Sequence, residues 1–262
     1  MKCVADRSEC SLTAEGLIGA RLLKDSGVKV NFTLGFSARE NVLITKISRP
    51  DYVNVFLGRI GAYMINNKLG DGSGAGEKAV ISSQNWVTGL TAENPWQTKQ
   101  IAASLRNHNQ LDLLAGVDVF TMPPKVAAEG KKELSGKFTS RTHENYDASI
   151  FDSAKNAHIE KFWEVDDKVL KLAERLSSKI PSTGVELIHI AHEEGCEDLF
   201  PSLSKEEKAF IVSDGKIPVH SRWENKIIEG KLAPDTLLTL AGLASFTSDQ
   251  EKLDQRIRGI IE

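Results

Sequence analysis

Three side chains suited to binding an anion follow predicted β-strands in this sequence. Arg59 stands near the end of the string VFLGRI, and Ser104 and Arg106 stand near the end of AASLRN. The carboxyl ends of parallel strands meet at one edge of a sheet, where α/β proteins bind their ligands. Arginine binds phosphate oxygens through two parallel hydrogen bonds and stays charged at every working pH. The pattern therefore predicts a site for a small phosphorylated metabolite; the alternative is that both arginines form ordinary surface ion pairs.

Composition narrows the class of protein. The chain has 262 residues, of which 40% are hydrophobic and 26% charged, and its formal net charge is −3. The chain therefore has no net positive charge of the kind that favours binding to nucleic acid or to an acidic membrane. No stretch approaches the roughly 18 apolar residues of a membrane span, and the N-terminus lacks a signal-peptide core. Cys3, Cys10 and Cys196 are odd in number and widely spaced, which is typical of reduced thiols in a cytoplasmic protein.

The first half of the chain alternates between strand and helix patterns. Such alternation predicts right-handed βαβ units and a parallel sheet. The predicted strands are 1–5, 28–36, 52–58, 99–105 and 117–122, and the predicted helices are 13–25, 38–47, 78–90 and 108–116. The Gly-rich stretch 70–77 is predicted to be a loop, and it lacks the Gly-Lys-Ser/Thr ending of a nucleotide-binding P-loop.

The strand pattern stops at about residue 130, and the remainder is predicted to be helical. Its predicted helices are 161–179, 184–195, 204–213, 222–230, 234–245 and 247–261. We therefore expect an α/β part over 1–130 and a mostly helical extension over 131–262. His189 and His192 are spaced as half a metal site, but helical histidine pairs are more often packing or surface residues. We expect no bound metal.

Several strings in the first half resemble the transaldolases in order and spacing. They are TAEGL at 13–17, the Asn-x-Thr strand at 31–33, FLGRI at 56–60, SLRN at 104–107 and AGVDVFTMPPK at 115–125. The tail strings DGKIP at 214–218 and SFTSDQEKLDQRI at 245–257 resemble the helical extension of longer members. The resemblance implies a (β/α)8 TIM barrel holding only strands four to eight, and lysine Schiff-base chemistry in the pentose phosphate pathway without metal or organic cofactor.

The resemblance also implies roles for single residues. Asn31 would hydrogen-bond a substrate hydroxyl, and Thr33 would help to position a catalytic water. Arg59, Ser104 and Arg106 would hold the sugar phosphate, and Phe36 and Phe56 would line an apolar wall. Asn54 stands where the family commonly has serine, so it is a weaker candidate for a substrate contact.

The Schiff-base lysine of the family has two candidate positions here. Counting back from the helix start without a gap reaches Glu9, which cannot form an imine. Lys2 lies in MKCVA, whose apolar character suits a barrel strand better than SECSL does. A lysine directed into an apolar barrel has a lowered pKa, because burial disfavours the ammonium form. We therefore take Lys2 as the imine candidate, which requires an insertion of roughly seven residues before the helix relative to the family pattern.

Two alternatives stay open at this point. The chain could be a sugar-phosphate-binding protein without the chemistry, or an inactive fragment of a longer transaldolase. Five strands cannot close a barrel of eight, so we expect an incomplete barrel or one that pairs with a second chain as a homo-oligomer. Its inner face, including Phe32, Phe36 and Phe56, would then lack the opposite half of its core.

Overall fold

Five parallel strands form one sheet in this computed structural model, which describes residues 7–92, 94–136 and 138–261. The strands are β1 (Arg7–Cys10), β2 (Lys29–Phe32), β3 (Tyr52–Phe56), β4 (Lys99–Ala103) and β5 (Val119–Thr121). Their spatial order is their chain order, and every neighbouring pair is parallel. The prediction of an α/β fold with a five-stranded parallel sheet is therefore confirmed.

Helices connect the strands and cover one face of the sheet. In chain order they are α1 (Ala14–Asp25), α2 (Ala38–Ser48), α3 (Leu57–Asn66), α4 (Ala75–Thr91), α5 (Asn109–Leu113) and α6 (Pro124–Glu133). Hydrogen bonds fix two of their starts: Thr13 caps α1, and Ser37 with Glu40 forms a capping box on α2. Val30, Val53 and Val55 point from the sheet into the cores beneath these helices. One-sided cover is what consecutive right-handed crossovers produce, and it is consistent with a TIM-barrel-like family.

The other face of the sheet is open. Glu9, Lys29, Asn31 and Tyr52 line a cavity of about 330 Å³ there. Our expectation that Phe32 and Phe36 belong to this face is wrong, since they are 1% and 0% exposed in the cores. Neighbouring residues of a strand point to opposite faces, so Phe32 and Asn31 cannot share one.

The predicted strands 1–5 and 52–58 differ from the structure. The described strand before α1 is Arg7–Cys10, in the polar string that we did not expect to form a strand, and the predicted strand 1–5 lies outside the described residues. An edge strand beside an open face needs few apolar side chains, which explains the weak signal. The predicted strand 52–58 ends at Phe56, and α3 follows at once, because the apolar run continues directly from strand into helix.

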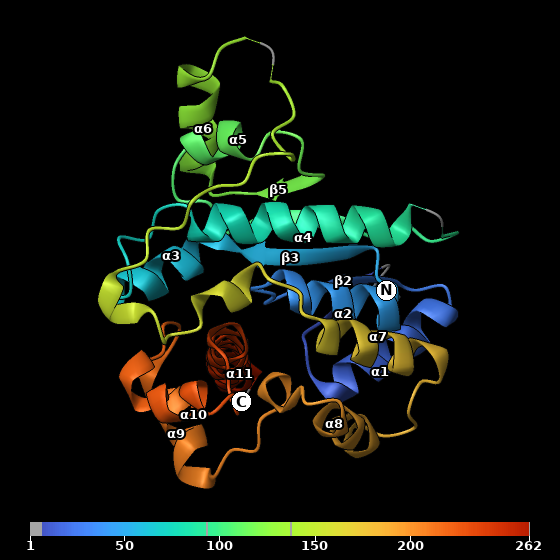
Figure 1. Cartoon of the computed structure of the whole chain (residues 1–262). Coiled ribbons are helices and arrows are strands. Elements are labelled where there is room, and N and C mark those ends of the chain that lie inside the picture. The colour runs from blue at the N-terminus through green and yellow to red at the C-terminus, as the bar shows by residue number, and fades with distance from the viewer. Residues whose placement is uncertain (1–6, 93, 137, 262) are drawn as a thin grey trace.

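The tail is helical, and its elements pack against the helices of the first half. They are α7 (Asp167–Ser178), α8 (Gly184–Glu193), α9 (Lys205–Asp214), α10 (Glu224–Ile228) and α11 (Pro234–Ile261), with short 3-10 turns at Asp152–Ala154, Ile159–Phe162, Glu197–Leu199 and His220–Arg222. Figure 1 shows α7 and α8 beside α2 and α1, with which they share a core. The two helices predicted over 234–261 form the single helix α11, because Phe246 and its neighbours continue the turn without a break.

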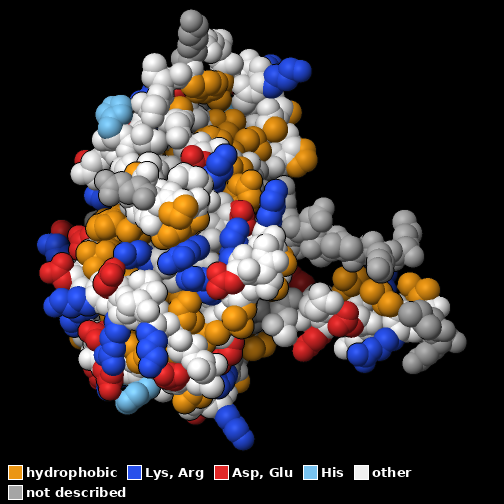
Figure 2. Space-filling view, turned by 90° about the vertical axis from the view of Figure 1, so that its right-hand side faces the viewer, with side chains coloured by type: hydrophobic (Ala, Val, Ile, Leu, Met, Phe, Trp, Pro, Cys, Tyr) orange, Lys and Arg blue, Asp and Glu red, His pale blue; other side chains and the backbone are white. Residues whose placement is uncertain are grey.

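The surface carries charges of both signs. Figure 2 shows Lys and Arg side chains interspersed with Asp and Glu over one face of the molecule. Among the described residues, no helix combines the length and the hydropathy that crossing a membrane requires.

Candidate functional site

The carboxyl ends of β3 and β4 bring the three predicted anion-binding residues to one place. Arg59 lies in the first turn of α3, which begins directly after β3. Ser104 and Arg106 lie on the loop that follows β4. Phe56 pairs with Ala103 in the sheet register, so the two segments leave the sheet side by side. The expected clustering is present, with Arg59 on a helix rather than on a strand.

Gly58 allows this clustering at close range. A Cβ atom at position 58 would lie 2.0 Å from the carbonyl oxygen of Ser104 and 2.5 Å from Nε of Arg106. Ser104 itself has a left-handed backbone with φ of 65°. This conformation costs an L-residue about 1–2 kcal/mol, and such strain is often found at ligand sites. The left-handed backbone of Ser104, together with the absence of a side chain at Gly58, places the Arg106 side chain against the start of α3.

Arg59 is nearly buried, and the part of the chain that the structure describes gives it no carboxylate partner. It is 9% exposed, and its Nη1 atom is buried without a hydrogen-bond partner among the described residues. Burial and then the positive charge of Arg106 lower the pKa of Arg59. A buried, unpaired guanidinium is costly, and an anion bound between the two arginines would remove that cost.

The start of α3 adds to the attraction for an anion. Its N-cap residue, Phe56, offers no side-chain acceptor to the first N–H groups of this 10-residue helix. Free N–H groups and the helix dipole make a helix N-terminus favourable for phosphate. Two arginines and a helix N-terminus therefore converge on the same edge of the sheet.

Gln110 of α5 fixes the loop that carries Arg106. Its Oε1 accepts the backbone N–H of Arg106 at 2.7 Å, and its Nε2 donates to Oε1 of Glu77 at 2.7 Å. Gln110 and Glu77 are both buried. The backbone of Arg106 is thus held in place, while its side chain stays exposed toward solvent.

A second group of polar residues lies on the open face across β1, β2 and β3. Nδ2 of Asn54 donates to Oδ1 of Asn31 at 2.8 Å and to the carbonyl of Phe32 at 2.6 Å. Nδ2 of Asn31 donates to Oε1 of Glu9 at 3.4 Å. Thr33 is half-buried just beyond β2, and its N–H donates to the carbonyl of Cys10 at 2.8 Å. Asn31, Asn54 and Glu9 therefore form one hydrogen-bonded row.

The register places Glu9, and not a lysine, opposite Asn31. The pairing of β1 with β2 sets Glu9 against Asn31 directly. Lys2, the predicted imine residue, lies outside the described residues. Our expectation that the string around Glu9 is not a strand is thus wrong, and the role of Lys2 stays a prediction.

Phe36 and Phe56, the predicted apolar wall, contact each other with ring centroids 5.9 Å apart. Only Phe56 is partly exposed, so it alone could touch a ligand. Nε2 of His192 donates to the carbonyl of Phe200 at 2.9 Å. The described residues contain no cluster of three or more His, Cys, Asp or Glu side chains that could hold a metal ion.

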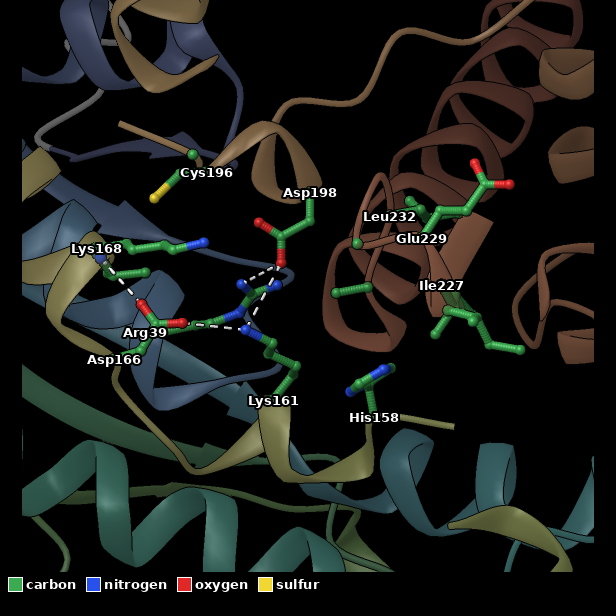
Figure 3. A pocket seen from close by; sticks show the side chains of 15 residues that line it. Arg39, His158, Lys161, Asp166, Lys168, Cys196, Asp198, Ile227, Glu229 and Leu232 are labelled. Carbon is green, nitrogen blue, oxygen red and sulfur yellow. Dashed lines mark hydrogen bonds and ion pairs between the residues drawn. The ribbon is translucent and has the colours of Figure 1, made fainter. Parts of the chain in front are cut away.

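A separate cavity of about 240 Å³ lies beside Arg39, and Figure 3 shows how its charged groups are paired. Nη1 of Arg39 contacts Oδ2 of Asp198 at 2.6 Å, and Asp235 binds the same guanidinium through both oxygens at 2.7 and 2.8 Å. Lys161 is likewise paired with Asp166 at 3.1 Å. Because these cations already have carboxylate partners, this cavity is a poorer anion site than the region of Arg59 and Arg106.

The sequence patterns did not indicate the residues that shape the anion site without contacting the anion themselves. Gly58 and Gln110 are two of them, although both lie inside or beside the strings FLGRI and SLRN. Phe246 of α11 is a third: its ring centroid lies 5.8 Å from Cζ of Arg59. The resemblance of the string SFTSDQEKLDQRI to a family extension was the one signal that could have indicated it.

Comparison with known proteins identifies the relatives of the chain. Residues 10–184 match the sequence model of the family described as Transaldolase/Fructose-6-phosphate aldolase. A protein named "Transaldolase" from Prochlorococcus marinus (strain MIT 9312) is 30% identical over 206 residues, which are 77% of this chain and 58% of that protein. A "Probable transaldolase" from Hyphomonas neptunium is 34% identical over 117 residues, 44% of this chain and 48% of that protein. The chain thus spans about half the length of the curated relatives that it matches.

Proposed function

Because the chain belongs to the transaldolase/fructose-6-phosphate aldolase family, we propose that it binds a sugar phosphate and acts in transaldolase-like transfer of a dihydroxyacetone unit between sugar phosphates. Arg59 supports the proposal because it is nearly buried, its Nη1 has no hydrogen-bond partner among the described residues, and the positive charge of Arg106 acts on it at the carboxyl ends of β3 and β4. In this proposal the phosphate binds between Arg59 and Arg106, with the Ser104 hydroxyl and the start of α3 as further donors.

The transfer step needs an amine, which we assign to Lys2. A neutral Lys2 would attack the carbonyl carbon of the sugar and release water, forming an imine. The protonated imine then accepts the electron pair of the C3–C4 bond as that bond breaks and the C4 hydroxyl gives its proton to a bound water. The aldehyde fragment leaves, and the three-carbon unit stays on Lys2 as an enamine. Asn31 would bind a substrate hydroxyl, and Thr33 would orient a water. In this proposal the five strands correspond to strands four to eight of a (β/α)8 barrel.

The phosphate site is tested by Arg106→Ala with fructose 6-phosphate and fructose as paired ligands. Loss of one charge-assisted hydrogen bond costs about 1.5–3 kcal/mol, so the affinity for fructose 6-phosphate should fall tenfold or more. Binding of unphosphorylated fructose should not change. Equal affinity of the variant and the wild type for fructose 6-phosphate would contradict the site.

A second candidate function is sugar-phosphate binding without transfer. One observation favours it: Glu9 occupies the position opposite Asn31, and a carboxylate cannot form an imine. Borohydride reduction in the presence of fructose 6-phosphate separates the two functions. A covalent sugar on the peptide that contains Lys2 supports transfer, whereas label on Lys29, Lys125 or another lysine refutes the Lys2 assignment. No label at all favours binding alone.

The cellular setting follows from the same proposal. We place the reaction in the pentose phosphate pathway of the cytoplasm, with sugar phosphates as partners and without metal or organic cofactor. Neither nucleic acid nor membrane is part of this proposal, and a homo-oligomer is compatible with the open sheet face.

A further inference from the structure

The guanidinium of Arg59 lies near two phenyl rings that come from distant parts of the chain. Its Cζ atom is 5.3 Å from the ring centroid of Phe56 and 5.8 Å from that of Phe246. Phe56 ends β3, whereas Phe246 belongs to α11 in the tail. An aromatic ring stabilises a cation without forming hydrogen bonds to it. The two rings therefore stabilise the charge of Arg59 and leave its N–H groups available.

Gly242 lets α11 pass close to Arg59. A Cβ atom at position 242 would lie 2.9 Å from Cδ2 of Leu34 and 3.3 Å from Nη1 of Arg59. Both neighbours are buried, and Leu34 is held in a left-handed conformation with φ of 59°. A larger residue at 242 would push the helix or the guanidinium away. Gly242 thus acts as a spacer between α11 and the anion site.

The contacts of α11 with the rest of the molecule fix Gly242 and Phe246 in place beside Arg59. Asp235 binds Arg39 through both carboxylate oxygens, and Thr239 contacts Oε1 of Glu40 at 2.8 Å and the carbonyl of Leu34 at 3.1 Å. Asp235, Thr239, Gly242 and Phe246 follow one another at intervals of four, three and four residues. This spacing sets all four on one face of the helix. The first two anchor α11, and the next two reach Arg59.

We propose that α11 forms the outer wall of the anion site, with Phe246 as a positioning residue that acts through Arg59. This inference rests on the proposed sugar-phosphate site. An acidic or amide side chain at 246 would hydrogen-bond Arg59 and compete with the phosphate, whereas a phenyl ring holds the cation and leaves its donors to the ligand. The helical tail is therefore a part of the binding site and not only a support for the barrel helices.

Phe246→Leu and Phe246→Tyr test the role of the ring in the full chain, with fructose 6-phosphate and fructose titrated by calorimetry. Leucine keeps an apolar side chain but removes the π face, so affinity for fructose 6-phosphate should fall by roughly threefold to tenfold. Tyrosine keeps the ring and should restore affinity to within about twofold of the wild type. Equal affinities of the leucine variant and the wild type, or equal losses for leucine and tyrosine, would overturn the inference.

Gly242→Ala tests the spacer, and Gly259→Ala on the same helix is its matched control. A Cβ at 259 would meet nothing within 4 Å, so both variants share the gain in helix propensity and only the first reaches Arg59. We expect about a tenfold or greater loss of affinity for Gly242→Ala and none for Gly259→Ala. Equal affinities for the two variants would contradict the spacer role.

Different results would contradict the phosphate site and the role of α11. If the wild type binds fructose 6-phosphate no better than fructose, or if Arg106→Ala changes nothing, the phosphate site itself is wrong. If Arg106→Ala weakens binding while the variants at 246 and 242 do not, only the role of α11 is wrong.

Discussion

Arg39 and Arg59 are both nearly buried arginines next to α11, but their surroundings are opposite. Arg39 is 1% exposed and forms ion pairs with Asp235 and Asp198 at 2.7 and 2.6 Å. Arg59 is 9% exposed, its Nη1 has no hydrogen-bond partner among the described residues, and its Cζ lies near the rings of Phe56 and Phe246. Burial alone would lower the pKa of each; the two aspartates outweigh this and raise the pKa of Arg39, whereas Arg106 lowers that of Arg59 further. Arg39 thus has its counterions within the fold, whereas the described residues supply none to Arg59, which is why we propose the phosphate site there.

The largest effect that this comparison predicts is on the stability of Arg39→Met. The substitution leaves Asp235 and Asp198 near each other in a buried site without their cation. Breaking a buried ion pair by removing one partner costs about 3–5 kcal/mol. Urea denaturation should show a loss of this size in the free energy of unfolding, and a loss below about 1 kcal/mol would mean that the pairing of Arg39 is not structural.

Arg59→Met should show the reverse pattern. It removes an unpaired buried charge, so the free energy of unfolding should stay unchanged or rise. The affinity for fructose 6-phosphate should fall by about 1.5–3 kcal/mol, which is roughly tenfold or more. Parallel denaturation and calorimetric titration of both methionine variants check the contrast. If Arg59→Met destabilises the chain as strongly as Arg39→Met does, the distinction between the two arginines is lost.

Glu40, next to Arg39 in the chain, contacts Thr239 of α11. Its titration should have a smaller effect on stability than the loss of Arg39, and this effect should depend on pH. Burial and then the negative charge of Asp235 raise its pKa from 4.5 to about 8. The single hydroxyl proton of Thr239 cannot serve both the carbonyl of Leu34 and an ionised Glu40, whereas a protonated Glu40 can donate to Thr239. Its oxygen Oε2 accepts the N–H groups of Phe36 and Ser37 in either state.

The sign of the pH effect follows from the raised pKa. Between pH 4.5 and about 8 the unfolded chain loses the Glu40 proton while the folded chain keeps it, so stability should decline as pH rises through this window. One group contributes at most about 1.4 kcal/mol per pH unit. Glu40→Gln keeps a neutral group of the same shape and should flatten the profile over these pH values. An unchanged slope in the variant would show that Glu40 is ionised in the folded state.

Sequence patterns predicted most of the local elements and the order of the site strings along the chain, but not the boundaries of the elements. The strings VFLGRI and AASLRN indicated Arg59, Ser104 and Arg106 as neighbours, and the register of β3 with β4 brings them together. The strand at Arg7–Cys10 was missed because an edge strand beside an open face has little apolar alternation. The start of α3 was missed because no capping residue separates it from β3.

What the sequence by itself determined is the alternation of strands and helices and the residue types at the strand ends. Both depend on spacing within a few positions, since strands repeat every two residues and helices every 3.6. Only the tertiary structure decided which arginine is paired, because Asp235 and Arg39 are 196 positions apart in the chain. It also decided that Phe246 covers Arg59 and that Glu9 stands opposite Asn31. Such contacts depend on how packed elements meet in space, and local periodicity carries no record of that.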